Sequence, residues 1–203
     1  MVRGIIIFVV FSIFINCTTI HNKKQFTLLN HEEKNIKLKT NGYYYSVYNR
    51  DSISTKNSGK GIYMKILLNN NTFHNVGNGY GDDCGKIIEL DCEIKKSEKM
   101  LYEYQKYTEK RKRGKNYDIW DWGKFSTKND TIKLQWFYNK FGQYYLIEEI
   151  GEIIDSTSFK LVRGIDYGEK TSWNMDRVYI FKPFDVEKMY EKTPLFNEII
   201  DTK

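Results

Sequence analysis

Few residues of this chain have the types and spacing that catalysis requires. The sequence contains three histidines, and two of them, His21 and His31, precede the first segment with a strand pattern. Only His74 remains for the folded part, so neither a histidine-based triad nor a three-histidine zinc site can be assembled there. Carboxylates are plentiful, but no pair stands out for a glycosidase-type mechanism. We therefore expect no enzymatic activity, no catalytic residue, no bound metal and no cofactor.

The three cysteines suggest two kinds of chemistry. Cys17 directly follows an apolar run and is a candidate for lipid attachment. Cys84 and Cys92 are an even pair, which in an oxidising compartment predicts a disulfide. A straight strand between them would separate their Cα atoms by about 26 Å, whereas a disulfide needs less than about 7 Å. Bonding therefore requires a turn within GKIIELD, and the alternative is that both cysteines stay reduced.

Residues 1–16 are predicted to be a signal peptide. Arg3 precedes an apolar run from Gly4 to Ile15, which as a helix would be about 18 Å long, too short for a hydrocarbon core of about 30 Å. The run ends at Cys17 and resembles the lipobox of bacterial lipoproteins. This resemblance implies that Cys17 receives a lipid, that the chain is cleaved in front of it, and that the lipid anchors the protein in a membrane. The alternative is an uncleaved apolar anchor.

Both alternatives place the remainder of the chain in the cell envelope. The residues directly after Cys17, TTIHN, include no acidic residue. In one group of Gram-negative bacteria, acidic residues at this position mark lipoproteins of the outer face. We therefore expect a lipid anchor in the outer membrane, with the protein facing the periplasm.

One strongly basic segment allows two interpretations. A helix is predicted from Ser97 onwards, and basic residues at its C-terminal end are what the helix dipole favours. The same residues would also suit contact with anionic lipid headgroups. Nucleic acid is excluded as a partner, because the chain is expected to leave the cytoplasm. These residues are Lys110, Arg111, Lys112 and Arg113.

The composition predicts a mainly β protein. The chain has 16 Tyr and 12 Phe, while Ala, the best helix former, does not occur. Alternating apolar segments are separated by short turns rich in Asn, Asp and Gly, and the clearest turn is Asn129-Asp130. We expect eight strands, at 42–48, 61–68, 72–76, 122–127, 131–138, 143–153, 157–162 and 177–182.

Eight sequential antiparallel strands close most economically into an up-and-down barrel, since closure removes both sheet edges. The segments WGKF, KNDTIKLQW and IIDSTSFKLV resemble the lipocalin-like domains of Bacteroidetes lipoproteins. The expected organisation is a lipidated tether at 17–40, a lipocalin-like domain at 41–184 with a helical insert at 77–118, and a short helix with a tail at 185–203.

The aromatic residues provide the main functional lead. An eight-stranded barrel holds either packed side chains or one small ligand. We expect Trp120, Trp122 and Trp173 to form a rim if the barrel is open, and to plug it if they are buried. The first hypothesis is a lipid-anchored module that binds a small apolar ligand, a glycan or an envelope component. The second is a structural or protein-interaction lipoprotein with a sealed barrel, and an enzyme is the weakest alternative. The residues expected to line the interior are Tyr43, Tyr45, Tyr63, Phe73, Phe125, Trp136, Tyr144 and Phe159.

Overall fold

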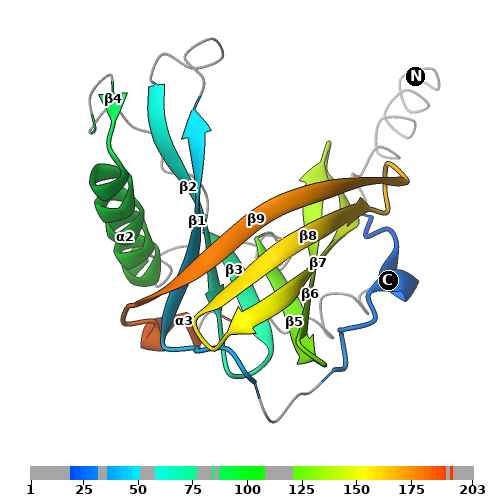
Figure 1. The fold of residues 1–203 in the computed structure, drawn as a ribbon. Coiled ribbons are helices and arrows are strands. Elements are labelled where there is room, and N and C mark those ends of the chain that lie inside the picture. Colours follow the sequence, from blue (N-terminus) through cyan, green and yellow to red (C-terminus); the bar gives the residue numbers. More distant parts are fainter. Residues whose placement is uncertain are drawn as a thin grey trace, which may run out of the picture.

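The protein is a closed antiparallel β-barrel with up-and-down topology (Figure 1). The computed structural model describes residues 19–31, 36–50, 58–76, 84, 87–107, 121–190 and 193. Within this part of the chain, each barrel strand pairs with its sequence neighbours, and β1 also pairs with the last strand and so closes the barrel. The predicted barrel is confirmed. Its strands are β1 (Gly42–Arg50), β2 (Ser58–Leu67), β3 (Thr72–Val76), β5 (Trp122–Lys128), β6 (Thr131–Lys140), β7 (Gln143–Asp155), β8 (Ser158–Asp166) and β9 (Thr171–Pro183).

Two strand predictions need correction. The last strand begins at Thr171, six residues before the predicted start, and it includes Pro183, which was expected to lie beyond it. A further short strand, β4 (Ile87–Ile88), pairs in parallel with the start of β2. The predicted turn at Asn129-Asp130 is present, with φ angles of 51° and 58° that suit a tight hairpin.

The helical insert covers one outer side of the barrel. Helix α2 (Leu90–Tyr107) lies along the outside of β1 and β2 (Figure 1). Its residues Ile94 and Leu101 pack against the outward residues of β2. It begins seven residues before the predicted start, so Ser97 is a buried residue within the helix and not its N-cap. Its apolar stripe explains this, because burial of Ile94 favours helix well before Ser97.

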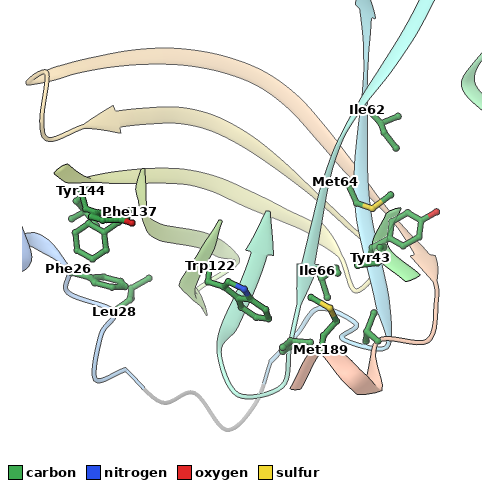
Figure 2. Close-up of a cluster of buried hydrophobic side chains, with 14 of the residues drawn as sticks. Phe26, Leu28, Tyr43, Ile62, Met64, Ile66, Trp122, Phe137, Tyr144 and Met189 are labelled. Carbon is green, nitrogen blue, oxygen red and sulfur yellow. The ribbon is translucent and has the colours of Figure 1, made fainter. Parts of the chain in front are cut away.

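Two hydrophobic clusters lie on opposite faces of the barrel wall. One contains Tyr44, Phe73, Phe125 and Phe159, which come from strands all around the barrel and therefore meet in its interior. The other lies outside, under α2 and the chain ends, as Figure 2 shows. Five aromatic residues predicted to line the interior do so, whereas three others face outwards because neighbouring positions on a strand alternate between faces. The inward ones are Tyr63, Phe73, Phe125, Trp136 and Phe159, and the outward ones are Tyr43, Tyr45 and Tyr144.

The described part of the predicted tether belongs to the fold. Phe26 and Leu28 are buried against the outer face of β6 and β7, where Phe26 meets the ring of Phe137 edge to face at 5.3 Å. The side chain of Gln135 accepts a hydrogen bond from the Leu28 amide at 3.0 Å and donates one to the Gln25 carbonyl at 3.1 Å. This part of the expected tether at 17–40 therefore packs against the barrel.

One end of the barrel is closed by the segment that leads into β1. Leu38 joins the interior cluster, and the Lys39 amide donates to the Ser156 carbonyl at 3.0 Å. The Tyr44 hydroxyl donates to the Lys39 carbonyl at 3.0 Å. Near this end the short helix α3 (Glu187–Tyr190) packs Met189 against the outer cluster, as predicted.

Candidate ligand-binding site

The interior of the barrel changes character towards the end opposite Leu38. Glu149, Gly164 and Trp173 are successive cross-strand partners on β7, β8 and β9, so they share one face of the sheet. Glu149 reaches across the barrel to Lys65 of β2, which shows that this face is the inner one. Trp173 nevertheless keeps 40% of its surface exposed. The inner face of the sheet is therefore accessible to solvent at Trp173.

The backbone ladder is also incomplete at this end. β1 pairs with β9 only through residues 42–45 and 180–183, although both strands continue beyond these pairs. Among the described residues, the second half of β1 therefore pairs only with β2, and the first part of β9 only with β8. The missing pairs leave a lateral seam between β1 and β9 beside this end.

A buried ion pair lies beneath this opening. Lys65 Nζ is 3.0 Å from Glu149 Oε2 and 2.6 Å from Asn75 Oδ1, and each charged residue is 5% exposed. The ammonium also lies 4.9 Å from the centroid of the Trp136 ring, within the range of a cation–π contact. Among the described residues, the Glu149 Oε2 atom has no hydrogen bond besides this ion pair. The cost of burying these two charges is therefore offset mainly by their mutual attraction and by the contact of the ammonium with the aromatic rings.

A second cation faces the interior from β9. The guanidinium of Arg177 lies 3.8 Å from the centroid of the Tyr63 ring. The neighbouring Tyr179 is buried, which raises the pKa of its hydroxyl, while the positive charge of Lys65 opposes the shift. Met175 and Trp136 are half-buried and supply apolar surface near these charges. The site thus combines two cations, one carboxylate and an aromatic lining.

Of the three tryptophans predicted to form a rim, Trp173 and Trp122 are described. Trp173 belongs to β9, not to a loop, and lies over Gly164, where an added Cβ would be 2.2 Å from its ring. Trp122 is 1% exposed and faces outwards, and its indole N–H donates to the Tyr104 hydroxyl of α2 at 3.3 Å. Trp122 is therefore neither part of a rim nor a plug, because α2 covers its side of the sheet. Trp120 lies outside the described residues.

The turns at this end form a pocket of about 270 Å³. Its lining comes from the β6–β7 and β8–β9 turns, and Phe141 at its edge is 96% exposed. Asp121, just before β5, has its pKa raised to about 6 by burial. Its carbonyl accepts a hydrogen bond from the Asn75 amide at 2.6 Å, which ties it to the end of β3.

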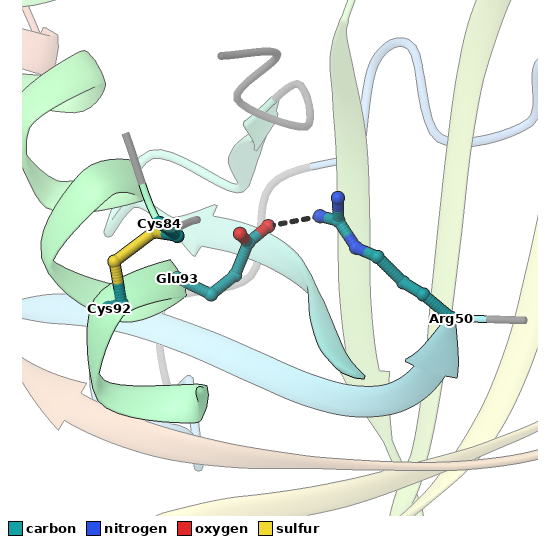
Figure 3. Close-up of a disulfide and its surroundings, with 4 residues drawn as sticks. All are labelled: Arg50, Cys84, Cys92 and Glu93. Atoms are coloured by element: carbon teal, nitrogen blue, oxygen red, sulfur yellow. Dashed lines mark hydrogen bonds and ion pairs between the residues drawn. A yellow bond between two sulfur atoms is a disulfide. The ribbon is translucent and has the colours of Figure 1, made fainter. Parts of the chain in front are cut away.

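The cysteine pair fastens the start of α2. Cys84 and Cys92 form a disulfide with a Cα–Cα distance of 5.9 Å, so the chain turns back between them as bonding required. Beside it, the buried Glu93 forms an ion pair with Arg50 at the end of β1 (Figure 3). The disulfide therefore braces the insert internally, and the ion pair between Arg50 and Glu93 ties the start of α2 to the end of β1.

The other predicted sites lie outside the described residues. These are the proposed lipid site Cys17 and the basic surface at Lys110, Arg111, Lys112 and Arg113. In the described ranges, no group of three or more His, Cys, Asp or Glu side chains is arranged to hold a metal ion. In the same ranges, no helix has both the length and the apolar composition needed to cross a membrane.

Sequence reasoning missed the central charged residues of this site. Lys65 is a single charge within the apolar run IYMKILL, and such a position is a weak signal of an inward polar residue. No motif or spacing in the sequence marks Glu149 or Arg177 as an inward charge. Comparison with protein-family models, with curated proteins and with solved structures found no match to this chain.

Proposed function

We propose that this protein is a lipid-anchored binding protein of the bacterial cell envelope, and that its barrel accepts a small ligand through the end opposite Leu38. The observation that carries the proposal is Trp173, which points into the barrel and yet is 40% exposed. The interrupted ladder between β1 and β9 supports it, since the wall beside Trp173 can open without loss of backbone hydrogen bonds. Binding sites typically combine such an apolar lining with a few fixed polar groups.

Anchoring is the second part of the proposal. The apolar run before Cys17 and its likeness to a lipobox support a lipid on this cysteine, with the barrel on the periplasmic side of the outer membrane. Expression of the full chain in a Gram-negative host with a palmitate analogue tests this directly. We expect label on the native protein and none on Cys17→Ala. Label that persists on Cys17→Ala contradicts the lipid site.

Ligand binding is tested with the full chain in phosphatidylcholine nanodiscs. Naphthamide and naphthoate are suitable probes, because the site is lined by aromatic rings, and empty nanodiscs measure the background. We expect saturable binding by isothermal titration calorimetry, weakened about fivefold or more by Trp173→Ala through the loss of ring contact. The matched control is Tyr102→Ala, which removes an exposed aromatic residue of α2 and should bind as the native protein does. Absence of binding by both probes contradicts the proposal.

The alternative is a protein-interaction role without a small ligand. It is favoured by three apolar residues on the outer face of β1 and β9, namely Val47, Val178 and Ile180, which are all exposed. The two candidates differ in one outcome. If the naphthalene probes fail while Val178→Asp and Ile180→Asp disturb recovery of a crosslinked partner, the interaction role replaces the binding role. We propose no enzymatic activity.

A further inference from the structure

The charged groups beneath the open end include one cation that has no ionic partner among the described residues. Lys65 and Arg177 are positive and Glu149 is negative. Glu149 neutralises Lys65 at 3.0 Å. Among the described residues, no carboxylate lies within ion-pair distance of Arg177, whereas six other cations besides Lys65 each have one. Those six are Lys37, Arg50, Lys133, Lys140, Lys160 and Lys182.

The surroundings of Arg177 hold its side chain without using its full donor capacity. The guanidinium lies against the Tyr63 ring with its flat face, and it is also hydrogen-bonded to the Tyr179 side chain, so part of its N–H fork stays available. Its five N–H donors lie in the guanidinium plane and form a fork that matches a carboxylate or phosphate. Tyr63 is in turn fixed by its contact with Tyr48, whose ring centroid is 4.6 Å away. Arg177 is therefore oriented before any ligand arrives.

A half-buried cation without a counter-charge costs stability, because burial weakens its hydration. Glu149 lies in the same part of the interior but is already paired with Lys65. The arrangement is favourable when an external anion enters, since a charge-assisted hydrogen bond in a partly dry site is roughly twice as strong as a neutral one. The apolar surface of Trp173 and Met175 would then cover the remainder of the ligand.

Building on the proposed binding function, we infer that the ligand is a small organic anion, and that Arg177 binds its carboxylate or phosphate group while its apolar part lies against Trp173 and Trp136. The proposal concerns a molecule that combines one anionic group with a flat or apolar body. Lys65 and Glu149 form the charged floor of the site and keep it polar in the absence of ligand.

The test compares naphthoate with naphthamide, which has the same ring system and no charge, on the full chain in phosphatidylcholine nanodiscs at neutral pH. We expect naphthoate to bind about 10-fold or more tightly than naphthamide. Arg177→Gln should reduce naphthoate binding by a similar factor while it changes naphthamide binding by less than about threefold. Arg177→Lys should recover part of the loss, because it keeps the charge but not the fork.

The matched control is Arg163→Gln, which removes an exposed arginine from the outer face of β8 and should leave both affinities unchanged. Far-ultraviolet circular dichroism and the melting temperature verify that each variant is folded. Naphthyl phosphate in the same titration separates the two anion types, and tight binding of either acid that depends on Arg177 supports the inference.

Equal binding of naphthoate and naphthamide overturns the anion inference but leaves the binding function in place. The same conclusion follows if Arg177→Gln folds and binds naphthoate as the native protein does. Failure of every probe overturns both.

Discussion

The ion pair between Lys65 and Glu149 leads to a sharp prediction about stability. The two side chains are 6% and 7% exposed, and their charged atoms are 3.0 Å apart. At an effective dielectric constant of about 20, this distance corresponds to an attraction of about 5.5 kcal/mol. Desolvation costs several kcal/mol for each ion, so the intact pair is close to neutral compared with apolar residues of similar volume. Loss of one partner, however, leaves a buried charge unpaired.

We expect Lys65→Met to lower the free energy of unfolding by about 3 to 5 kcal/mol. Methionine keeps most of the volume and the apolar stem, so the loss comes from the unpaired Glu149 carboxylate and not from a cavity. The double variant Lys65→Met/Glu149→Leu should return to within about 1.5 kcal/mol of the native protein, because no charge remains buried. Guanidinium unfolding of the full chain in nonionic detergent, followed by tryptophan fluorescence, measures both values.

The matched control is Lys160→Met. It breaks an ion pair of similar length with Asp176, 2.9 Å, whose side chains are 35% and 79% exposed. An exposed pair contributes less than about 1 kcal/mol, so this variant should unfold almost as the native protein does. The reasoning is refuted if Lys65→Met costs no more than Lys160→Met, or if the double variant is as unstable as Lys65→Met alone.

Three further results are expected. The pKa of Asp121 is raised to about 6 by burial, so the folded state binds the proton more readily than the unfolded chain. The contribution of Asp121 to the free energy of unfolding is present below about pH 4 and is lost as the pH rises through about 6. Asp121→Asn should therefore raise the free energy of unfolding by up to about 3 kcal/mol at neutral pH. In unfolding experiments, the free energy of unfolding of this variant should decrease less with rising pH than that of the native protein. Replacement of Cys84 and Cys92 by serine should lower the unfolding free energy by about 2.5 kcal/mol through the lost loop constraint, and equal midpoints for the oxidised native protein and the variant would contradict this. Gly164→Ala should displace the Trp173 ring, which a Cβ would approach to 2.2 Å, and so shift the tryptophan emission and weaken probe binding, while an unchanged spectrum would contradict the described contact.

The strands and hairpins were predictable because they depend on neighbours in the chain. KNDTIKLQW specifies a strand after a turn with positive φ at Asn129 and Asp130, and the structure has both. Eight such segments in sequence predict a closed barrel, because closure removes both exposed edges of the sheet. The start of β9 was missed, because Trp173-Asn174-Met175-Asp176 alternates less clearly, and three of these four residues are exposed.

The inner face of each strand was not predictable from alternation. Tyr43, Tyr44 and Tyr45 are consecutive aromatic residues, and only Tyr44 points into the barrel. A period of two assigns the faces when one side meets water, but here α2 and the N-terminal segment bury much of the outer side as well. Trp122 was placed at the rim for the same reason, since nothing local indicates that Tyr104 of the helix covers it.

By itself, the sequence determined the strand order, the hairpin turns, the pairing potential of the two later cysteines and the expectation of an anchor at Cys17. These depend on residue type and on short spacing along the chain. Only the tertiary structure decided that Lys65 meets Glu149 from the opposite wall, that Arg177 lies over Tyr63 with no carboxylate partner among the described residues, and that β1 and β9 pair over only part of their length. Those contacts join residues more than 80 positions apart, and their energies depend on burial, which exists only once the barrel has closed.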